Sequence, residues 1–296
     1  MKVTGITIIR NAVTNDYPIV EAIRSILPLV DECIVAVGDS DDDTLGLIRS
    51  INSPKIRIEQ TVWDMRIRKG GEILAVETNK VLDMVSADTD WVVYIQGDEV
   101  IHEKYHSLIN KAMQHYLPKT KIEGLLFHYL HFYGTYDYVG DSRKWYKYET
   151  RIIRHHRGIR SYRDAQGFRK QQHQKIDVAL IDAYVYHYGW VKNPKLMKQK
   201  QKNVVAFWND NDEAVQHFQR TEDFFDYNDF DSIRRFEGTH PAVMKERIQF
   251  KNWELELDIR KKNMPMKYRL LYWIEKWTGK RLFTFTNHII KKKFRG

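Results

Sequence analysis

Short apolar runs alternate with amphipathic segments through the first hundred residues. Four runs have the length and composition of buried β-strands, at residues 6–9, 33–37, 56–58 and 91–95. Between them, apolar side chains recur at helical spacing over residues 18–26, 45–51 and 73–85. This alternation is typical of βαβ units. We therefore predict an α/β fold with a Rossmann-like, mostly parallel central sheet and helices on both faces.

The pattern changes after residue 100. Further strands are expected at residues 125–130, 150–153 and 183–188, and from Pro194 onward polar and apolar residues fall at helical spacing. Residues 222–231, which are acidic and aromatic, indicate a loop or short helix. The prediction is a sheet-bearing domain over residues 1–192 and an α-helical appendage over residues 193–296, which ends in a basic, aromatic segment.

Positive charge is concentrated at the carboxyl end of the chain. Of 296 residues, 48 are Lys or Arg and 39 are Asp or Glu, a net charge of +9, and residues 260–296 carry twelve of these bases against Glu275 alone. Aromatic and aliphatic residues are interleaved with the bases, a pattern that favours an anionic membrane surface or a polyanion. The alternative is a packed helix with a solvated basic face. No nucleic-acid reader motif accompanies the charge, so no nucleic-acid partner is expected.

Cysteine content and hydropathy indicate the compartment. Cys33 is the single cysteine and lies in an apolar run, which excludes an internal disulfide framework and suits a reducing cytosol. The amino terminus lacks the form of a signal peptide, and no apolar run is long enough to cross a bilayer. We expect a cytoplasmic protein able to associate peripherally with the inner face of the cytoplasmic membrane.

The strand at residues 91–95 breaks into the most informative segment, Gln96, Gly97, Asp98 and Glu99. In an open α/β sheet, ligands bind at the carboxyl ends of the strands. Paired acids at that edge suit a divalent cation that holds a phosphate-bearing substrate. The alternative is a turn with solvated charges.

Four segments, in order along the chain, resemble the family-2 glycosyltransferases of GT-A fold, of the type that builds bacterial cell-surface glycans. They are residues 8–11, residues 27–35 with 40–44, residues 69–71 with Asn79, and residues 96–98 in the place of the family's DxD motif. The resemblance covers roughly residues 3 to 190. Two positions depart from it: Gln96 stands where the motif begins with Asp, and Val37 replaces an acid that contacts the nucleotide base, with Asp39 the nearest substitute.

The resemblance implies transfer of a sugar from a nucleotide-sugar donor to a glycan or lipid-linked acceptor, with inversion and with Mn²⁺ or Mg²⁺ as cofactor. Asp98 and His187 are the expected metal ligands. Asp164 is the first candidate for the base that takes the acceptor proton, with Glu99 as its rival. The residues expected at the donor are Arg10, Asn11, Asp39, Arg66, Lys69, Gly70, Gly71 and Gln96, the glycines because their amides begin a helix.

Other interpretations of the same residues stay open. His187 is equally a structural histidine between tyrosines, and Asp164 an ion-pair partner of Arg160 or Arg163. Arg151 or Arg154 could face the same pocket, and Trp145, Tyr146, Tyr148 and Trp190 could stack on sugar rings. At the level of the whole protein, the alternatives are a non-catalytic protein that binds a nucleotide-sugar, a polyanion or a membrane surface, and a nucleotidyltransferase.

Overall fold

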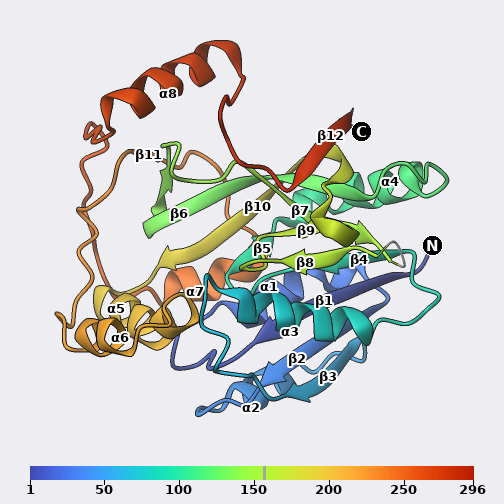
Figure 1. Cartoon of the computed structure of the whole chain (residues 1–296), viewed down its shortest axis with the longest axis horizontal. Coiled ribbons are helices and arrows are strands. Elements are labelled where there is room, and N and C mark those ends of the chain that lie inside the picture. Colours follow the sequence, from blue (N-terminus) through green and yellow to red (C-terminus); the bar gives the residue numbers. More distant parts are fainter. Residues whose placement is uncertain (156–157) are drawn as a thin grey trace.

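The computed structural model describes residues 1–155 and 158–296 of the chain. A long, twisted sheet runs through the molecule, with helices on both of its faces (Figure 1). Its strand order is β12-β10-β6-β7-β4-β1-β2-β3, and β5 and β11 pair with β10 and β6 off this path. The predicted α/β class with a mostly parallel central sheet is confirmed.

The amino-terminal half is built from parallel strands joined by helices. The strands are β1 (Val3–Ile9), β2 (Glu32–Gly38), β3 (Ile56–Thr61) and β4 (Trp91–Tyr94). The connecting helices are α1 (Ile19–Ile26), α2 (Thr44–Arg49) and α3 (Glu72–Asp83). β1 pairs in parallel with β2 and β4, and β2 in parallel with β3. All the strands and helices predicted for this half are present.

After β4, the sheet contains both parallel and antiparallel neighbours. The strands that follow are β5 (Glu99–Ile101), β6 (Gly124–Gly140), β7 (Tyr148–Arg154) and β10 (Ile176–Val191), and helix α4 (His106–Tyr116) lies between β5 and β6. β7 is antiparallel to both β4 and β6, whereas β10 runs parallel to β6 and antiparallel to β5. The predicted strands are confirmed and are longer than the sequence pattern indicated. A separate hairpin is formed by β8 (Arg160–Tyr162) and β9 (Gly167–Arg169).

Residues 193–296 contribute helices and also return to the sheet. The helices are α5 (Pro194–Val204), α6 (Asp212–Gln219), α7 (Lys245–Gln249) and α8 (Met266–Thr278), and the strands are β11 (Ile233–Arg235) and β12 (His288–Phe294). Single turns of 3-10 helix occur at Leu27–Leu29, Glu103–Tyr105, Gln171–His173, Val205–Phe207 and Ala242–Met244. Residues 222–231 form a loop. The appendage contains helices, as predicted. It also adds two strands to the sheet, because β11 pairs with β6 and β12 with β10. The domain boundary at residue 192 stays a prediction.

Apolar side chains on both faces of the strands form the core. Along β2, Cys33 and Val35 lie in one apolar cluster and Ile34 in the cluster on the opposite face. Successive side chains of a strand point to opposite faces, so a strand covered on both sides is apolar at every position. This explains why the strand runs read as continuous rather than alternating.

A buried ion pair joins the first residue of β5 to β7. Arg151 donates through Nε to Glu99 Oε2 at 2.8 Å and through Nη2 to Glu99 Oε1 at 2.7 Å, and neither side chain is exposed. The Tyr129 hydroxyl donates to Glu99 Oε1 at 2.8 Å, and the backbone N–H of Gln96 donates to Glu99 Oε2 at 3.2 Å. The bidentate geometry and these extra donors compensate both charges for their loss of water.

We expect Arg151→Met to lower the free energy of unfolding by about 3–5 kcal/mol, because it leaves the Glu99 carboxylate buried without a counter-ion. Urea denaturation followed by tryptophan fluorescence measures the loss. The matched control is Arg160→Met, which removes an ion pair with Asp83 whose side chains are 52% and 62% exposed. That control should change stability by less than about 1 kcal/mol. Equal effects of the two variants would contradict a special role for the buried pair.

Candidate functional site

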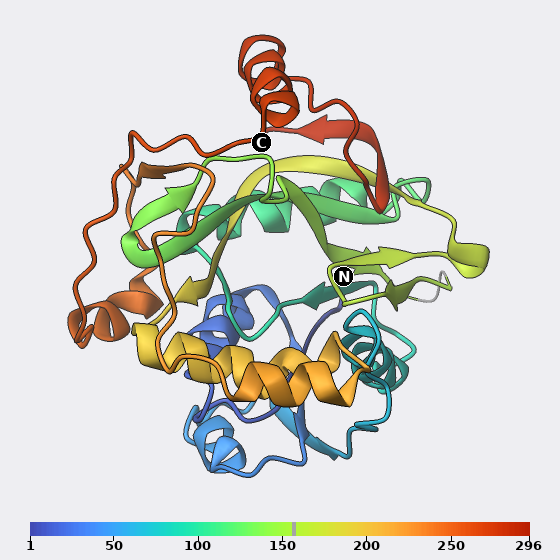
Figure 2. The same cartoon turned by 60° about the vertical axis from the view of Figure 1, so that its left-hand side comes forward.

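A cavity of about 740 Å³ lies at the carboxyl ends of β1 and β4. One wall comes from the ends of these strands, and others come from β6, β10, the turn between β8 and β9, and helix α5. Figure 2 shows α5 and α6 crossing in front of the amino-terminal half of the sheet. Six residues predicted as site residues line the cavity: Arg10, Asn11, Gln96, Asp98, Asp164 and His187.

Pairing between β5 and β10 brings Asp98 and His187 together. Glu99 is the register partner of His187, and the Tyr188 backbone N–H donates to the Asp98 carbonyl at 2.8 Å. The Asp98 Oδ1 atom consequently lies 3.7 Å from His187 Nε2. Gly189 is required here, because a Cβ at this position would lie 2.6 Å from Asp98 Oδ2. The two predicted metal ligands are therefore neighbours.

Lys200 of α5 reaches the same carboxylate. Its Nζ donates to Asp98 Oδ2 at 3.2 Å and to the Gly189 carbonyl at 3.1 Å, and it lies 4.6 Å from the centre of the Tyr17 ring. Burial disfavours the charge of Asp98, but the Lys200 ammonium, through its charge and its hydrogen bond, outweighs burial and lowers the pKa of this carboxyl to about 2. Sequence reasoning missed Lys200, because it is one of several lysines in a helix and nothing in their spacing distinguishes it.

His187 is held in turn by His131 of β6. The two Nδ1 atoms lie 3.3 Å apart, and His131 Nε2 lies 2.9 Å from the Tyr146 carbonyl. A carbonyl can only accept, so we assign the proton of neutral His131 to Nε2, and its Nδ1 then accepts from Nδ1–H of His187. This leaves the unprotonated Nε2 of His187 facing Asp98 and the cavity. Burial lowers the pKa of both rings, that of His131 well below its ordinary value.

We expect both histidines to be neutral at pH 7, with His131 protonated on Nε2 and His187 on Nδ1. The reason is burial, which lowers both pKa values, together with the acceptor role of the Tyr146 carbonyl. Long-range ¹H–¹⁵N correlation spectra report the tautomer of each ring, and His131→Phe assigns the signals. A His187 ring that carries its proton on Nε2, or on both nitrogens at pH 7, would contradict this arrangement.

Asp164 lies in the tight turn between β8 and β9. Its two neighbours have left-handed backbone conformations, with φ of 57° at Arg163 and 59° at Ala165. Such conformations are costly outside glycine and are concentrated at functional sites. Burial raises the pKa of the Asp164 carboxyl above its ordinary value, which favours a proton acceptor at neutral pH.

Hydrogen bonds from the strand ends fix this turn. Gln96 Nε2 donates to the Ala165 carbonyl and to the Tyr94 hydroxyl, both at 3.3 Å, and Arg151 Nη1 donates to the Gln166 carbonyl at 2.8 Å. Gln96 thus links the Asp98 segment to the Asp164 turn. Arg151, predicted as a candidate for the pocket, instead holds the Asp164 turn from behind and pairs with Glu99. The rival base Glu99 is fully buried in that pair and does not line the cavity.

The other predicted donor residues divide into two groups. Arg10 and Asn11 line the cavity, where Arg10 Nε donates to the Asp39 carbonyl at 2.8 Å. The remaining five do not line it: Asp39, Arg66, Lys69, Gly70 and Gly71. The Arg66 side chain is 90% exposed and pairs with Asp64. The Gly71 amide donates to the Phe207 carbonyl at 2.8 Å, so the start of α3 that it caps is joined to the 3-10 turn at Val205–Phe207.

Aromatic side chains form part of the cavity wall. Of the four aromatic candidates, Trp145, Tyr146 and Trp190 line it and Tyr148 does not. Trp145 and Trp190 meet edge to face, with ring centres 6.1 Å apart. Flat apolar faces with polar edges are suited to contact with sugar rings.

The cavity offers an incomplete set of ligands for a divalent cation. No group of three or more His, Cys, Asp or Glu side chains that could hold a metal is found among residues 1–155 and 158–296. Asp98 and His187 would be enough if a bound diphosphate supplied further oxygens. However, the Lys200 ammonium is already bonded to Asp98, and a second cation beside it would be repelled. With Lys200 in this place, the residues do not fit the predicted Mn²⁺ or Mg²⁺.

Comparisons with known proteins give matches only among solved structures. No protein-family model matches the chain, and no curated protein matches it. The chain is similar to S. aureus TarS, with a TM-score of 0.40 and 14% identity over 74% of this chain and 42% of that chain. For TarS 1-349 in complex with UDP the TM-score is 0.40 and the identity 15%, over 74% and 69% of the two chains.

A second similar structure is glucosyl-3-phosphoglycerate synthase from Mycobacterium tuberculosis in complex with Mn²⁺, UDP and phosphoglyceric acid. Its TM-score is 0.30 and its identity 23%, over 44% of this chain and 43% of that chain. The matched region spans less than half of the TarS chain and of the synthase chain.

Proposed function

We propose that this protein is a glycosyltransferase that passes a sugar from a nucleotide-sugar donor to a glycan or lipid-linked acceptor, with inversion. The observation that carries the proposal is the shared cavity, which brings the Asp98, His187 and Lys200 cluster and the Asp164 turn to the carboxyl ends of β1 and β4. Its volume is within the range of roughly 300–1,000 Å³ that is usual for small-molecule sites. Arg10 and Asn11 supply polar groups to its lining, and Trp145 and Trp190 supply apolar faces.

The reaction assigns separate tasks to the two acidic segments. The acceptor hydroxyl oxygen forms a bond to the anomeric carbon as the bond to the diphosphate oxygen breaks, and the electron pair leaves with the nucleoside diphosphate. Asp164 accepts the proton of the hydroxyl, a role that its raised pKa supports. The departing diphosphate needs a positive group beside it, and the cluster of Asp98, His187 and Lys200 contains one ammonium. Glu99 has a structural role in this proposal, because its carboxylate is used by Arg151.

We expect the protein to release a nucleoside diphosphate from at least one member of a panel of UDP- and GDP-sugars, with water or an added glycan as acceptor. Asp164→Asn should lower this rate by roughly 100-fold, because the amide cannot take the acceptor proton, and should leave nucleotide affinity unchanged. Coupled detection of the diphosphate measures the rate. Asp182→Asn, at an exposed position of β10 that does not line the cavity, is the matched control.

Three outcomes of this assay would contradict the proposal. Nucleotide binding without turnover would favour the non-catalytic binding protein, and release of pyrophosphate would favour a nucleotidyltransferase. An Asp164→Asn rate equal to that of the control would remove Asp164 from the mechanism. The same assay with EDTA in place of Mn²⁺ or Mg²⁺ tests the predicted metal dependence.

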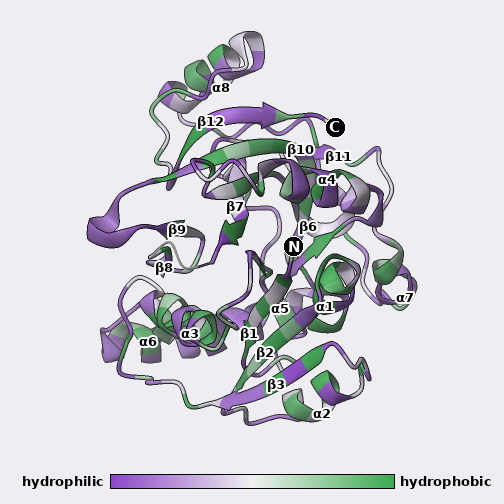
Figure 3. Cartoon of the chain, turned by 90° about the vertical axis from the view of Figure 1, so that its right-hand side faces the viewer, coloured by the Kyte–Doolittle hydropathy of each residue, from purple (hydrophilic) through white to green (hydrophobic). Residues whose placement is uncertain are grey.

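We further propose that α8 attaches the protein to an anionic membrane surface, at the cytoplasmic face where a lipid-linked acceptor would be met. Apolar residues recur along α8 at every third or fourth position and stay exposed: Met266 87%, Leu270 64%, Trp273 64% and Trp277 94%. In the next loop, Phe283 is 91% exposed. Figure 3 shows α8 standing apart from the sheet. Within the part of the chain that the structure describes, none of the helices is long and apolar enough to cross a membrane.

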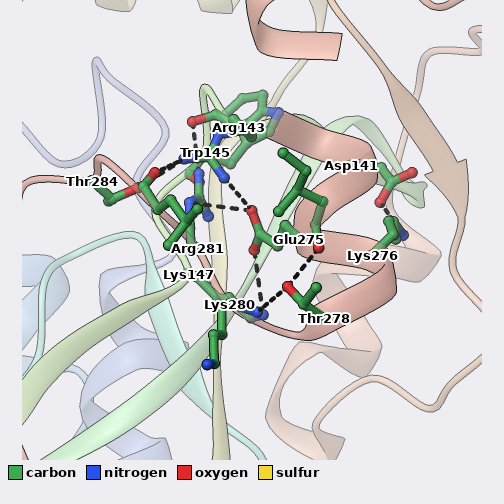
Figure 4. Close-up of polar contacts among 12 residues, drawn as sticks. Asp141, Arg143, Trp145, Lys147, Glu275, Lys276, Thr278, Lys280, Arg281 and Thr284 are labelled. Carbon is green, nitrogen blue, oxygen red and sulfur yellow. Dashed lines mark hydrogen bonds and ion pairs between the residues drawn. The ribbon is translucent and has the colours of Figure 1, made fainter. Parts of the chain in front are cut away.

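Polar contacts hold the opposite side of α8 against the protein. Tyr272 donates to Asp141 at 2.7 Å. Glu275 accepts from Arg143 at 2.8 Å (Figure 4). Lys276 pairs with Asp141, and Arg281 lies 3.7 Å from Glu275. The helix is therefore fixed by its polar side, and its apolar side faces outward among bases. This arrangement suits a helix that lies in the headgroup region of an anionic bilayer.

We expect the protein to sediment with phosphatidylglycerol vesicles, less so in high salt, and not with phosphatidylcholine vesicles. Replacing both Trp273 and Trp277 by Ala should lower vesicle affinity by roughly tenfold or more, because two aromatic side chains no longer enter the interface. Phe250→Ala is the matched control, since Phe250 is 80% exposed after α7. Binding that is equal in the double variant and the control would exclude α8 as the contact.

A further inference from the structure

The ammonium group of Lys200 is fixed in the wall of the cavity. The Lys200 side chain is 13% exposed and crosses from α5 to the carboxyl end of β4, where it bonds Asp98 and the Gly189 carbonyl. Its position over the Tyr17 ring adds a cation–π contact at 4.6 Å. Since Asp98, Gly189 and Tyr17 all line the same cavity, the charge of Lys200 lies where a ligand would enter.

Lys200 differs from Lys202 of the same helix in the burial of its partner. The two lysine side chains are 13% and 16% exposed, but Lys200 pairs with Asp98, which is 15% exposed, whereas Lys202 pairs at 3.0 Å with Asp223, which is 77% exposed. Removing an ammonium from water is costly, and surface ion pairs contribute little in return. An ammonium has three protons to donate, and the hydrogen bonds described for Lys200 use two of them. One further donor is thus available to a ligand in the cavity.

We propose that Lys200 is a catalytic residue that neutralises the leaving diphosphate through its ammonium group, in the place where the sequence predicts a divalent cation. This inference rests on the proposed function. A negatively charged Asp98 would by itself repel a diphosphate, so the cluster can accept one only through a cation, and Lys200 is the cation that the structure places on Asp98. Asp98 then orients the ammonium, while His187 is a neutral acceptor beside it.

The substitution of Gln96 for the first acid of the motif is consistent with this role. Its side-chain amide nitrogen donates to Tyr94 and Ala165, so Gln96 ties the turn of Asp164 to the strand end.

When the anomeric carbon–oxygen bond breaks, the electron pair moves to the diphosphate oxygen. Lys200 stabilises that oxygen by a charge-assisted hydrogen bond and keeps its proton.

The test is the affinity for UDP and GDP, measured by calorimetry in EDTA and again in Mn²⁺. We expect wild-type protein to bind one of these diphosphates in EDTA, and Lys200→Met to weaken that binding by roughly 10- to 100-fold through loss of a charged hydrogen bond. Lys200→Arg should retain most of it. Lys195→Met is the control on the same helix. Thermal melts establish that each variant is folded.

Asp98→Asn is a second variant, which tests the role of Lys200 even if Lys200→Met does not fold. It retains the ammonium, so diphosphate binding in EDTA should persist within a few-fold. Two results would show that Asp98 is a metal ligand and would disprove the role of Lys200. The first is that wild-type protein binds a diphosphate only with Mn²⁺, and the second is that Asp98→Asn abolishes binding while Lys200→Met does not. The transferase proposal survives either result. If neither diphosphate binds in either condition and no donor is turned over, the transferase proposal itself fails.

Discussion

The buried ion pair between Glu99 and Arg151 is the interaction on which the geometry of the cavity depends. Glu99 lies directly after the cavity residue Asp98, and Arg151 belongs to β7, which runs antiparallel to β4. Arg151 also donates to the Gln166 carbonyl in the Asp164 turn. A single guanidinium thus fixes the position of both acidic segments. A bidentate pair in a dry environment has a narrow range of allowed geometries, which makes it a precise positioning device.

The pair also explains why two adjacent carboxylates have different environments. Asp98 lies in the turn after β4 and lines the cavity, whereas Glu99 begins β5 and its carboxylate is buried against Arg151. Glu99 is compensated by Arg151 and Tyr129, and Asp98 by Lys200. Each acid has its own cation, delivered from a different element. The positive and negative charges are therefore matched locally before any ligand arrives.

Contributions from the second half of the chain complete the site. β10 supplies His187 and Gly189, β6 supplies His131 behind them, and α5 supplies Lys200. The reversal at β7 places these later segments beside the ends of β1 and β4. In the same way, β12 returns to the edge of the sheet after α8, which fixes α8 outside the core at both of its ends. The proposed catalytic and membrane-contacting parts are thus built on one continuous sheet.

What the sequence determined by itself was local. Apolar runs and helical spacing identified the strands and helices of the first half, because strands covered on both faces must be apolar throughout. The break at Gln96 to Glu99 identified the strand end that lines the cavity, because a ligand site in an α/β sheet follows the carboxyl ends of its strands. Asp164 and His187 were predicted from the resemblance to a known family, and both line the same cavity, while their chemical roles stay predictions.

Only the tertiary structure decided which charges meet. Arg151, more than fifty residues later in the chain, pairs with Glu99 and leaves Asp98 as the acid that lines the cavity. The ammonium group that pairs with Asp98 comes from Lys200. These ion pairs form because elements far apart in the sequence lie close together in space. The spacing of residues along the chain does not show which elements will do so. The predicted phosphate site at Gly70 and Gly71 shows the same limit, because the Gly71 amide is used by Phe207, a residue brought there by the helices that follow β10.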